Sequence, residues 1–326
     1  MVRLLGVVAM ALALACGGTL AAKLDLAAVN QAQFSEGEPK GVDPMLLRAQ
    51  ILLDRARFSP GLIDGRLSDN FSKAVAAFQA ANGLPSDGKL TRETWDKLAA
   101  TFAGPVLINY EVTAKDVRGP FTRRIPARME RMAHLKRLGY RNAREKLAER
   151  FHVSEQLLRL LNPKTGFRKA DTTLVVPDVG RGGPPAEVAS VEVDKGTRQV
   201  RALDASGKAL AVYPASIGSE EKPAPSGAAE VRRVVRNPTY RYNPAYHFKG
   251  VQSRKPFTIK PGPNNPVGTV WINLTAEGYG IHGTPSPDKV SKAESHGCVR
   301  LTNWDAERVA ASVAKGTPIA FVEGSR

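Results

Sequence analysis

The stretch Ile281-His282-Gly283-Thr284, followed by Ser295-His296-Gly297-Cys298-Val299-Arg300-Leu301, carries the densest chemical information in the chain. It gathers a thiol, two imidazoles, a guanidinium and two glycines within a short span. A thiol becomes a useful nucleophile when its surroundings shift it toward thiolate, and a neighbouring imidazole is the usual means. We therefore expect Cys298 to be a nucleophile, with His282 and His296 as its partners.

The cluster allows two other interpretations. A lone cysteine is most often a small buried hydrophobe, but Cys298 is one of two cysteines in the chain, and two of the five histidines lie beside it in sequence. A structural zinc site takes four Cys or His ligands in paired short spacings, and this cluster offers three at most. We expect no metal and no other cofactor.

Residues 1–22 are typical of a secretory signal peptide, with one positive charge at Arg3, an apolar run and small residues up to Ala22. We expect the mature protein to be exported, to the periplasm or the cell wall. Cys16 faintly resembles a lipoprotein acylation site, so the membrane is a partner only if Cys16 is lipidated. A cysteine that remains alone after cleavage is easier to understand if its thiol is used.

Lys and Arg outnumber Asp and Glu by 47 to 31 among the 326 residues, a net charge of +16. Such a surface favours polyanionic partners. After export nucleic acid is not expected, and carboxylate-rich cell-wall polymer or an anionic membrane surface is the better expectation, although a high pI can also serve solubility alone. The length allows two or three domains, and we expect a monomer.

Residues 41–100 are predicted to form a small helical unit, because apolar residues recur with helical spacing. The phrases Asp64-Gly65-Arg66-Leu67-Ser68 and Asp87-Gly88-Lys89-Leu90-Thr91 each supply an Asp-Gly turn, with Ser68 or Thr91 placed to cap a following helix. With Ala74-Val75-Ala76-Ala77-Phe78-Gln79 and Asn82-Gly83-Leu84, the segment resembles the peptidoglycan-binding type 1 domain, which implies a three-helix bundle.

Residues 108–178 are similar to a LysM glycan-binding module in their second half. The pattern runs from Leu147-Ala148 through Leu161-Asn162-Pro163 to Val175-Val176-Pro177. In the first half a basic insertion around Arg118 to Arg141 is expected to replace the short strand and turn of such modules. The resemblance implies an α/β segment that contacts glycan.

Residues 179–186 are rich in Gly and Pro and are predicted to be a linker. Beyond it, residues 187–323 are predicted to form a mostly β domain with one or two helices. One helix is expected over Trp304 to Ala314, with a capping box from Thr302 to Asp305. Strands are expected at residues 188–193, 199–202, 210–217, 229–235, 270–274 and 318–322.

This last region resembles the YkuD-type L,D-transpeptidase catalytic domain. The resemblance rests on Pro225-Ser226-Gly227, Asn265-Pro266-Val267-Gly268, Trp271-Ile272, His282-Gly283-Thr284 and the Ser295 to Leu301 run. The chain departs from the family at Val290-Ser291-Lys292-Ala293, where members often carry a glycine. The fold class predicted for the whole chain is thus multidomain: a small three-helix peptidoglycan-binding domain, a LysM-like α/β segment and a mostly β YkuD-type catalytic domain.

The resemblance implies that the protein cross-links peptidoglycan stem peptides. Cys298 would attack the bond before the terminal D-alanine of a donor tetrapeptide, D-alanine would leave, and an amine of a neighbouring stem would resolve the thioester as a 3→3 link. His282 is expected to take and return the proton, and His296 to hold the thiolate or position the substrate. The oxyanion and substrate contacts are expected from Gly297, Gly283, Ser295 and Arg300.

Several alternatives stay open at this point. Water as acceptor would make the protein an L,D-carboxypeptidase, and a protein lysine as acceptor would make it a protein-to-peptidoglycan attachment enzyme. Sortases also order His, Cys and Arg, but they typically carry Thr-Leu-x-Thr-Cys where this chain has Glu294-Ser295-His296-Gly297-Cys298. A non-catalytic cell-wall-binding protein is the remaining possibility. The expected partners are peptidoglycan stem peptides and glycan.

Overall fold

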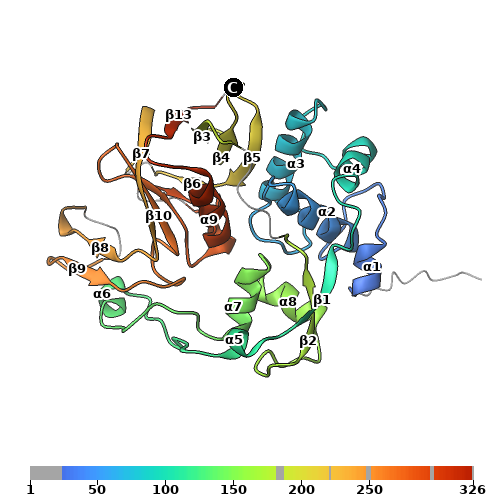
Figure 1. Cartoon of the computed structure of the whole chain (residues 1–326), viewed down its shortest axis with the longest axis horizontal. Coiled ribbons are helices and arrows are strands. Elements are labelled where there is room, and N and C mark those ends of the chain that lie inside the picture. Colours follow the sequence, from blue (N-terminus) through green and yellow to red (C-terminus); the bar gives the residue numbers. More distant parts are fainter. Residues whose placement is uncertain (1–23, 181–186, 220–221, 247–250, 294–296, 325–326) are drawn as a thin grey trace, which may run out of the picture.

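The structure, a computed structural model, describes residues 24–180, 187–219, 222–246, 251–293 and 297–324 (Figure 1). Helices α1 to α4 lie together on one side of the molecule, the β-rich part lies on the other, and the segment from α5 to β2 runs beneath both. The expected signal peptide, Cys16 and residues 181–186 of the expected linker fall outside the described residues. In the described part, no helix has both the length and the apolar character needed to cross a membrane.

The elements follow one another along the chain in the order given in Figure 1. The helices are α1 Leu26–Asn30, α2 Pro44–Arg55, α3 Asp69–Ala81, α4 Arg92–Ala99, α5 Ala114–Val117, α6 Met129–Met132, α7 Ala143–Arg150, α8 Glu155–Leu161 and α9 Asn303–Ser312. The strands are β1 Leu107–Glu111, β2 Thr173–Pro177, β3 Ser190–Asp194, β4 Gln199–Leu203, β5 Ala209–Pro214, β6 Ser216–Ile217, β7 Gly227–Arg236, β8 Tyr240–Tyr242, β9 Phe257–Ile259, β10 Val270–Leu274, β11 Gly280–His282, β12 Val299–Arg300 and β13 Pro318–Val322.

The helical unit over residues 41–100 contains α2, α3 and α4, and its predicted caps are confirmed. The Ser68 hydroxyl oxygen accepts a hydrogen bond from the backbone N–H of Phe71 at the start of α3. Thr91 does the same for Thr94 at the start of α4. Each cap pairs one of the backbone N–H groups that the start of a helix leaves without a partner. Such a cap typically stabilises the protein by about 1 kcal/mol.

The middle segment contains a strand that the sequence interpretation missed. β1 pairs antiparallel with β2 over their full lengths, from Leu107 opposite Pro177 to Glu111 opposite Thr173, and α7 and α8 lie between them in the chain. The expectation that the basic insertion replaces this strand is therefore wrong. The insertion, residues 118–141, follows β1 and α5 and carries the short helix α6.

The β-rich part is built on a sheet with the strand order β5-β4-β3-β13-β7-β10-β11-β12-β6. The strands expected at residues 270–274 and 318–322 are confirmed with those bounds, and the others lie within three residues of the expected limits. Helix α9 packs against β10 and β11, and the Thr302 hydroxyl oxygen accepts from the backbone N–H of Asp305 at its start. The hairpin of β8 and β9 forms a small separate sheet.

One loop joins the helical unit to both other parts. After α2, Phe58 forms a parallel β-bridge with Val212 of β5, and Ile63 forms another with Val153 of the middle segment. Val212 is buried in the same hydrophobic cluster as the cores of the helical unit and the middle segment. An exposed edge strand invites uncontrolled pairing, and here the loop covers part of the edge strand β5.

Buried charges lie where the three parts meet. Asp54 of α2 is fully buried and accepts two hydrogen bonds from Arg308 of α9, at 2.8 and 2.9 Å. His152 lies 3.1 Å from the same carboxylate and stacks on Trp304 at a centroid distance of 5.0 Å. Burial alone raises the pKa of Asp54, but Arg308 and His152 outweigh it, so the pKa is well below its usual range. The carboxylate therefore stays ionised inside the protein.

Candidate active site

His282 and Cys298, two of the expected catalytic residues, lie on one face of the sheet. β11 runs parallel to β12 with His282 opposite Arg300, and antiparallel to β10 with His282 opposite Trp271. Because side chains alternate along a strand, Cys298 shares the face of Arg300. The other face is apolar: Ile272, Ile281 and Val299 are buried in the core cluster that also contains residues of α9. One side of the sheet thus serves packing and the other is available for chemistry.

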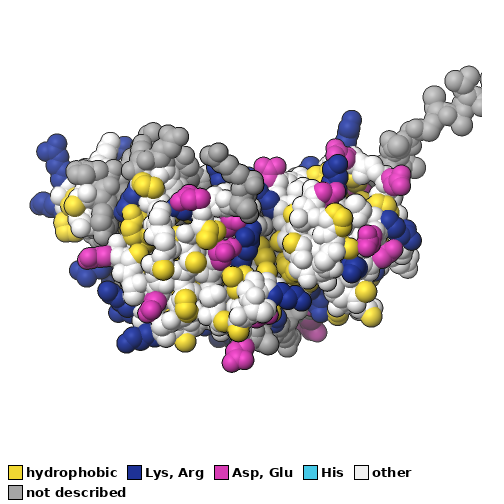
Figure 2. All heavy atoms as spheres, turned by 90° about the horizontal axis from the view of Figure 1, so that it is seen from above, with side chains coloured by type: hydrophobic (Ala, Val, Ile, Leu, Met, Phe, Trp, Pro, Cys, Tyr) yellow, Lys and Arg dark blue, Asp and Glu magenta, His cyan; other side chains and the backbone are white. Residues whose placement is uncertain are grey.

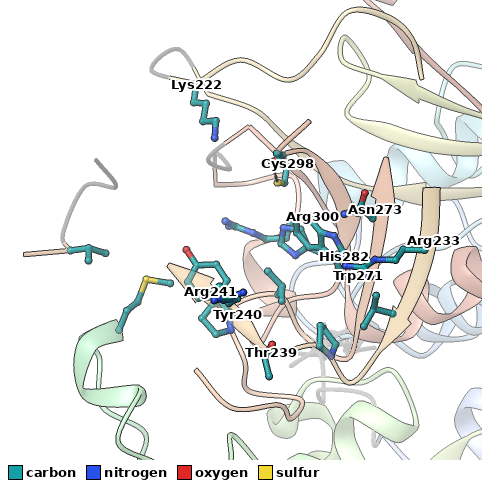
Figure 3. A pocket seen from close by; sticks show the side chains of 17 residues that line it. Lys222, Arg233, Thr239, Tyr240, Arg241, Trp271, Asn273, His282, Cys298 and Arg300 are labelled. Carbon is teal, nitrogen blue, oxygen red and sulfur yellow. Dashed lines mark hydrogen bonds between the residues drawn. The ribbon is translucent and has the colours of Figure 1, made fainter. Parts of the chain in front are cut away.

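A cavity of about 520 Å³ lies on this face. Figure 3 shows Cys298, His282 and Trp271 close together within it, with the Arg300 side chain extending into the open space and Lys222 approaching from above. Among the described residues, the cationic side chains of Lys222, Arg233, Arg241 and Arg300 line the cavity. In Figure 2 Lys and Arg side chains gather at the end of the molecule where Figure 1 places β8 and β9. An anionic ligand is the natural occupant of such a site.

His282 is held as a neutral base. Its Nδ1 lies 2.6 Å from the Gly283 carbonyl oxygen, which can only accept, so Nδ1 carries the proton and donates. Its ring stacks on Trp271 at a centroid distance of 5.4 Å and an interplanar angle of 19°. Burial, reinforced by the nearby positive charge of Arg300, lowers the pKa of His282 to about 3. At neutral pH the imidazole is therefore uncharged, with Nε2 free of a proton and able to accept one.

Gly280 has a specific role that the sequence did not reveal. A Cβ added there would lie 2.6 Å from Cζ2 of Trp271, so any side chain would displace the indole. Trp271 is the ring on which His282 stacks. The absence of a side chain at Gly280 thus keeps the histidine in its orientation.

Cys298 is half-buried and lines the cavity. Burial raises the pKa of its thiol, while a backbone hydrogen bond from Gly280 and the positive charges of Lys222 and Arg300 oppose this rise. The resting form is therefore the thiol. Desolvation disfavours both charged forms, the thiolate and the imidazolium. The pair instead consists of a protonated thiol and a neutral base.

Gly297 and Gly283 take different places at the site. Gly297 has φ +92°, in the left-handed region, and a Cβ there would lie 2.9 Å from Tyr279. Its lack of a side chain makes room for Tyr279 and Lys222. Gly283 is not among the described residues that line the cavity. Its carbonyl orients His282, and the Asn303 side chain fills the space that a Gly283 side chain would need.

The loop between His282 and Cys298 explains the departure from the family pattern. Ser291 has φ +65°, a conformation that glycine adopts without cost. The structure compensates with hydrogen bonds: Ser291 N–H donates to Ser216 Oγ at 3.0 Å, and Ser291 Oγ donates to the Ala215 carbonyl at 3.1 Å. Asn70 of α3 donates to the Val290 carbonyl at 3.1 Å. The helical unit therefore helps to fix the loop that leads to the nucleophile.

The structure brings His282, Cys298 and Arg300 into one cavity, whereas Ser295 and His296 lie outside the described residues. The cavity also contains functional candidates that the sequence interpretation did not assign to the site. Trp271 and Asn273 could have been found from the alternation in β10, where Val270, Ile272 and Leu274 are buried. Lys222, Arg233 and Arg241 come from distant parts of the chain, and no local pattern marks them.

The protonation states predict how Cys298 reacts with iodoacetamide. We expect the alkylation rate to be low at pH 7 and to keep rising above about pH 8.5, the usual thiol pKa, because the pKa of Cys298 is raised. His282, with a pKa of about 3, should add no inflection between about pH 5 and 8. Mass spectrometry of the peptide that contains Cys298 measures the rate. A rate that is constant across that range would indicate a thiolate–imidazolium pair and contradict this description.

With this geometry established, comparison with known proteins identifies two domains. Residues 189–320 match the YkuD family, described as the L,D-transpeptidase catalytic domain. Residues 43–98 match a family described as a putative peptidoglycan binding domain. Over these residues the chain thus matches an L,D-transpeptidase catalytic domain and a putative peptidoglycan-binding domain.

Individual relatives match over parts of their length. The putative L,D-transpeptidase YkuD of Bacillus licheniformis is 40% identical over 62 residues, which are 19% of this chain and 38% of that protein, so the chain spans well under half of that relative. The protein of the same name from Bacillus subtilis is 26% identical over 175 residues, 53% of this chain and 89% of that protein. The crystal structure of an L,D-transpeptidase from Xylanimonas cellulosilytica matches with 16% identity and a TM-score of 0.38, covering 89% of this chain and 100% of that chain.

Proposed function

We propose that the protein is a peptidoglycan L,D-transpeptidase that forms 3→3 cross-links through a thioester on Cys298. The observation that carries this proposal is the placement in one cationic cavity of a thiol, just before β12, and a neutral, oriented imidazole on the adjacent parallel strand β11. The match of residues 189–320 to the L,D-transpeptidase catalytic domain supports the same reaction class.

In the first step Cys298 Sγ attacks the carbonyl carbon that precedes the terminal D-alanine of a donor tetrapeptide. The thiol proton passes to Nε2 of His282 as the S–C bond forms, so the nucleophile is ionised only when it reacts. His282 then gives that proton to the departing amine, the C–N bond breaks, and D-alanine leaves. A thioester remains on Cys298, and His282 is neutral again.

In the second step an amine of a neighbouring stem peptide attacks the thioester. His282 takes a proton from that amine and returns it to the cysteine sulfur as the new amide forms. Both steps pass through an oxyanion, and we propose the backbone N–H groups of Gly297 and Cys298 as its donors, each worth roughly 3 kcal/mol in such sites. We propose that Arg300 pairs with a substrate carboxylate, and that Ser295 and His296 help to position the substrate.

We further propose that the N-terminal half binds the cell wall after export of the protein. The peptidoglycan-binding family match supports this for residues 43–98, and the order β1, α7, α8, β2 with antiparallel strands supports a LysM-like module in the middle segment. A surface hollow of about 940 Å³ lies against α8 and the loop before β2.

Replacing Arg159 in this hollow by Glu should reduce the fraction of protein that pellets with purified sacculi. Unchanged pelleting would exclude the hollow as a glycan site.

The decisive experiment is incubation with defined muropeptides followed by mass analysis of the products. We expect dimers joined by a 3→3 link, with one D-alanine released per link. Tripeptides without dimers would show that water is the acceptor and that the protein is an L,D-carboxypeptidase. If no donor is consumed and added protein lysine is not joined to the stem, the chain only binds the cell wall.

A further inference from the structure

The cavity extends from Cys298 to a helix outside the catalytic domain. Its lining residues include Met129 of α6, which belongs to the basic insertion of the middle segment, residues 118–141. Figure 3 shows this helix, in green, at the edge of the cavity opposite Cys298. Met129 and the neighbouring Val251 contribute apolar lining, and Arg241, which Figure 3 shows on the same side of the cavity as this helix, contributes charge. Two distant parts of the chain thus share one cavity.

The insertion forms hydrogen bonds with the catalytic domain next to Val251, which lines the cavity. Glu130 of α6 accepts backbone hydrogen bonds from Gln252 at 2.6 Å and Ser253 at 3.1 Å. Backbone hydrogen bonds from Glu130 itself, Gln252 and Ser253 lower the pKa of the Glu130 carboxyl. Val251, the neighbouring residue, lines the cavity. The carboxylate therefore fixes the chain that forms the cavity wall.

A second attachment lies on the other side of β9. Leu138, whose side chain is fully buried, donates its N–H to the Pro261 carbonyl at 3.0 Å and accepts from the N–H of Asn264 at 2.9 Å. Gly262 has φ +144° and lies so close to the Leu138 backbone that no side chain fits there. The insertion thus holds the chain both before and after β9. The hairpin of β8 and β9 that it holds supplies Tyr240 and Arg241 to the cavity.

From these contacts we infer that the insertion is part of the substrate site: α6 closes the end of the cavity away from Cys298 and holds the β8–β9 hairpin as its wall. This inference rests on the proposed function. The ligand group that fits this end is the portion of the donor peptide remote from the scissile bond. A carboxylate of that portion would pair with Arg241 and its aliphatic groups would contact Met129, whose flexible thioether adapts to irregular shapes. The insertion is thus a specificity element that the middle segment contributes.

The test is steady-state kinetics with a tetrapeptide donor, comparing Glu130→Ala and Met129→Ala with the wild type. We expect KM to rise about tenfold in each while kcat stays within about twofold, because the lost contacts bind ground state and transition state equally. Glu130→Gln, which keeps an acceptor oxygen, should recover part of the loss. Met132→Ala on the same helix, which does not line the cavity, is the matched control and should stay near wild type.

The outcomes separate this inference from the proposed function. If the wild type consumes no donor, the proposed function fails. If the wild type is active and Met129→Ala and Glu130→Ala leave KM within about twofold of its value, the inference is overturned. The same holds if kcat falls while KM does not, or if Met132→Ala raises KM as much. Alkylation of Cys298 should proceed at the wild-type rate in every variant, which shows that the catalytic end is intact.

Discussion

Cys298→Ala is expected to abolish formation of 3→3 dimers and release of D-alanine in the muropeptide assay. The reason is that the other described groups in the cavity are hydroxyls, a lysine amine, an indole, an amide, guanidinium groups and a neutral imidazole, and none of them attacks an amide carbonyl as readily as the thiolate formed from Cys298. Without the sulfur no thioester forms, and the second step has no substrate. We expect the rate to fall at least about 10⁴-fold, as when other covalent catalysts lose their nucleophile.

The chain offers a matched control for this substitution. Cys16→Ala removes the other cysteine of the sequence and should leave the reaction of the purified protein unchanged. Intact-mass analysis of the wild type stopped during turnover should show an added acyl group, which Cys298→Ala lacks. Dimer formation by Cys298→Ala at a rate comparable to that of the wild type would end the proposed mechanism.

Arg308→Leu is expected to lower the free energy of unfolding by about 3–5 kcal/mol, the usual cost of removing one partner of a buried ion pair. Arg308 donates two hydrogen bonds to Asp54, which is fully buried. Without the guanidinium the carboxylate must stay charged without its main partner or take up a proton. Because Asp54 lies on α2 and Arg308 on α9, the loss should also loosen the contact between the helical unit and the catalytic domain. Urea denaturation measures the change.

An exposed pair provides the comparison. Arg92 and Asp96 form an i,i+4 salt bridge on α4 with side chains that are 68% and 59% exposed, so Arg92→Leu should cost only about 0.3–0.5 kcal/mol. The double variant Asp54→Leu with Arg308→Leu should lower the free energy of unfolding by less than the sum of the two single changes. The reason is that it leaves no unpaired charge at this ion pair. If Arg308→Leu and Arg92→Leu lower the free energy of unfolding by the same amount, the buried pair does not stabilise the fold as described.

The sequence predicted those features that depend on neighbouring residues. The caps at Ser68 and Thr91 follow from side chains that bond backbone groups three residues ahead. The strand over residues 270–274 follows from strict alternation. The placement of His282 and Cys298 in one cavity follows from the unusual density of reactive side chains in one stretch. In each case the physical cause acts within a few residues, so a local pattern is enough to reveal it.

The features that the sequence did not predict depend on contacts between distant segments. Asp54, His152 and Arg308 come from three parts of the chain, and each alone resembles an ordinary polar residue. The sequence predicts only that the basic insertion replaces a strand, because nothing in its composition shows that Leu138 is fully buried against the catalytic domain. The sequence also does not predict the protonation state of Cys298, because the pKa of its thiol depends on burial.

The parallel pairing of β11 with β12 has a consequence for the length of chain between the two catalytic groups. Between two parallel strands the chain must return from the end of the first strand to the level at which that strand began. This crossover connection needs a dozen or more residues. Residues 283–298 form this connection between His282 and Val299. The number of residues between the base and the nucleophile therefore has a lower limit, which the parallel pairing sets. Shortening it by several residues should prevent the two strands from aligning, whereas lengthening it at the exposed Lys292 should be tolerated.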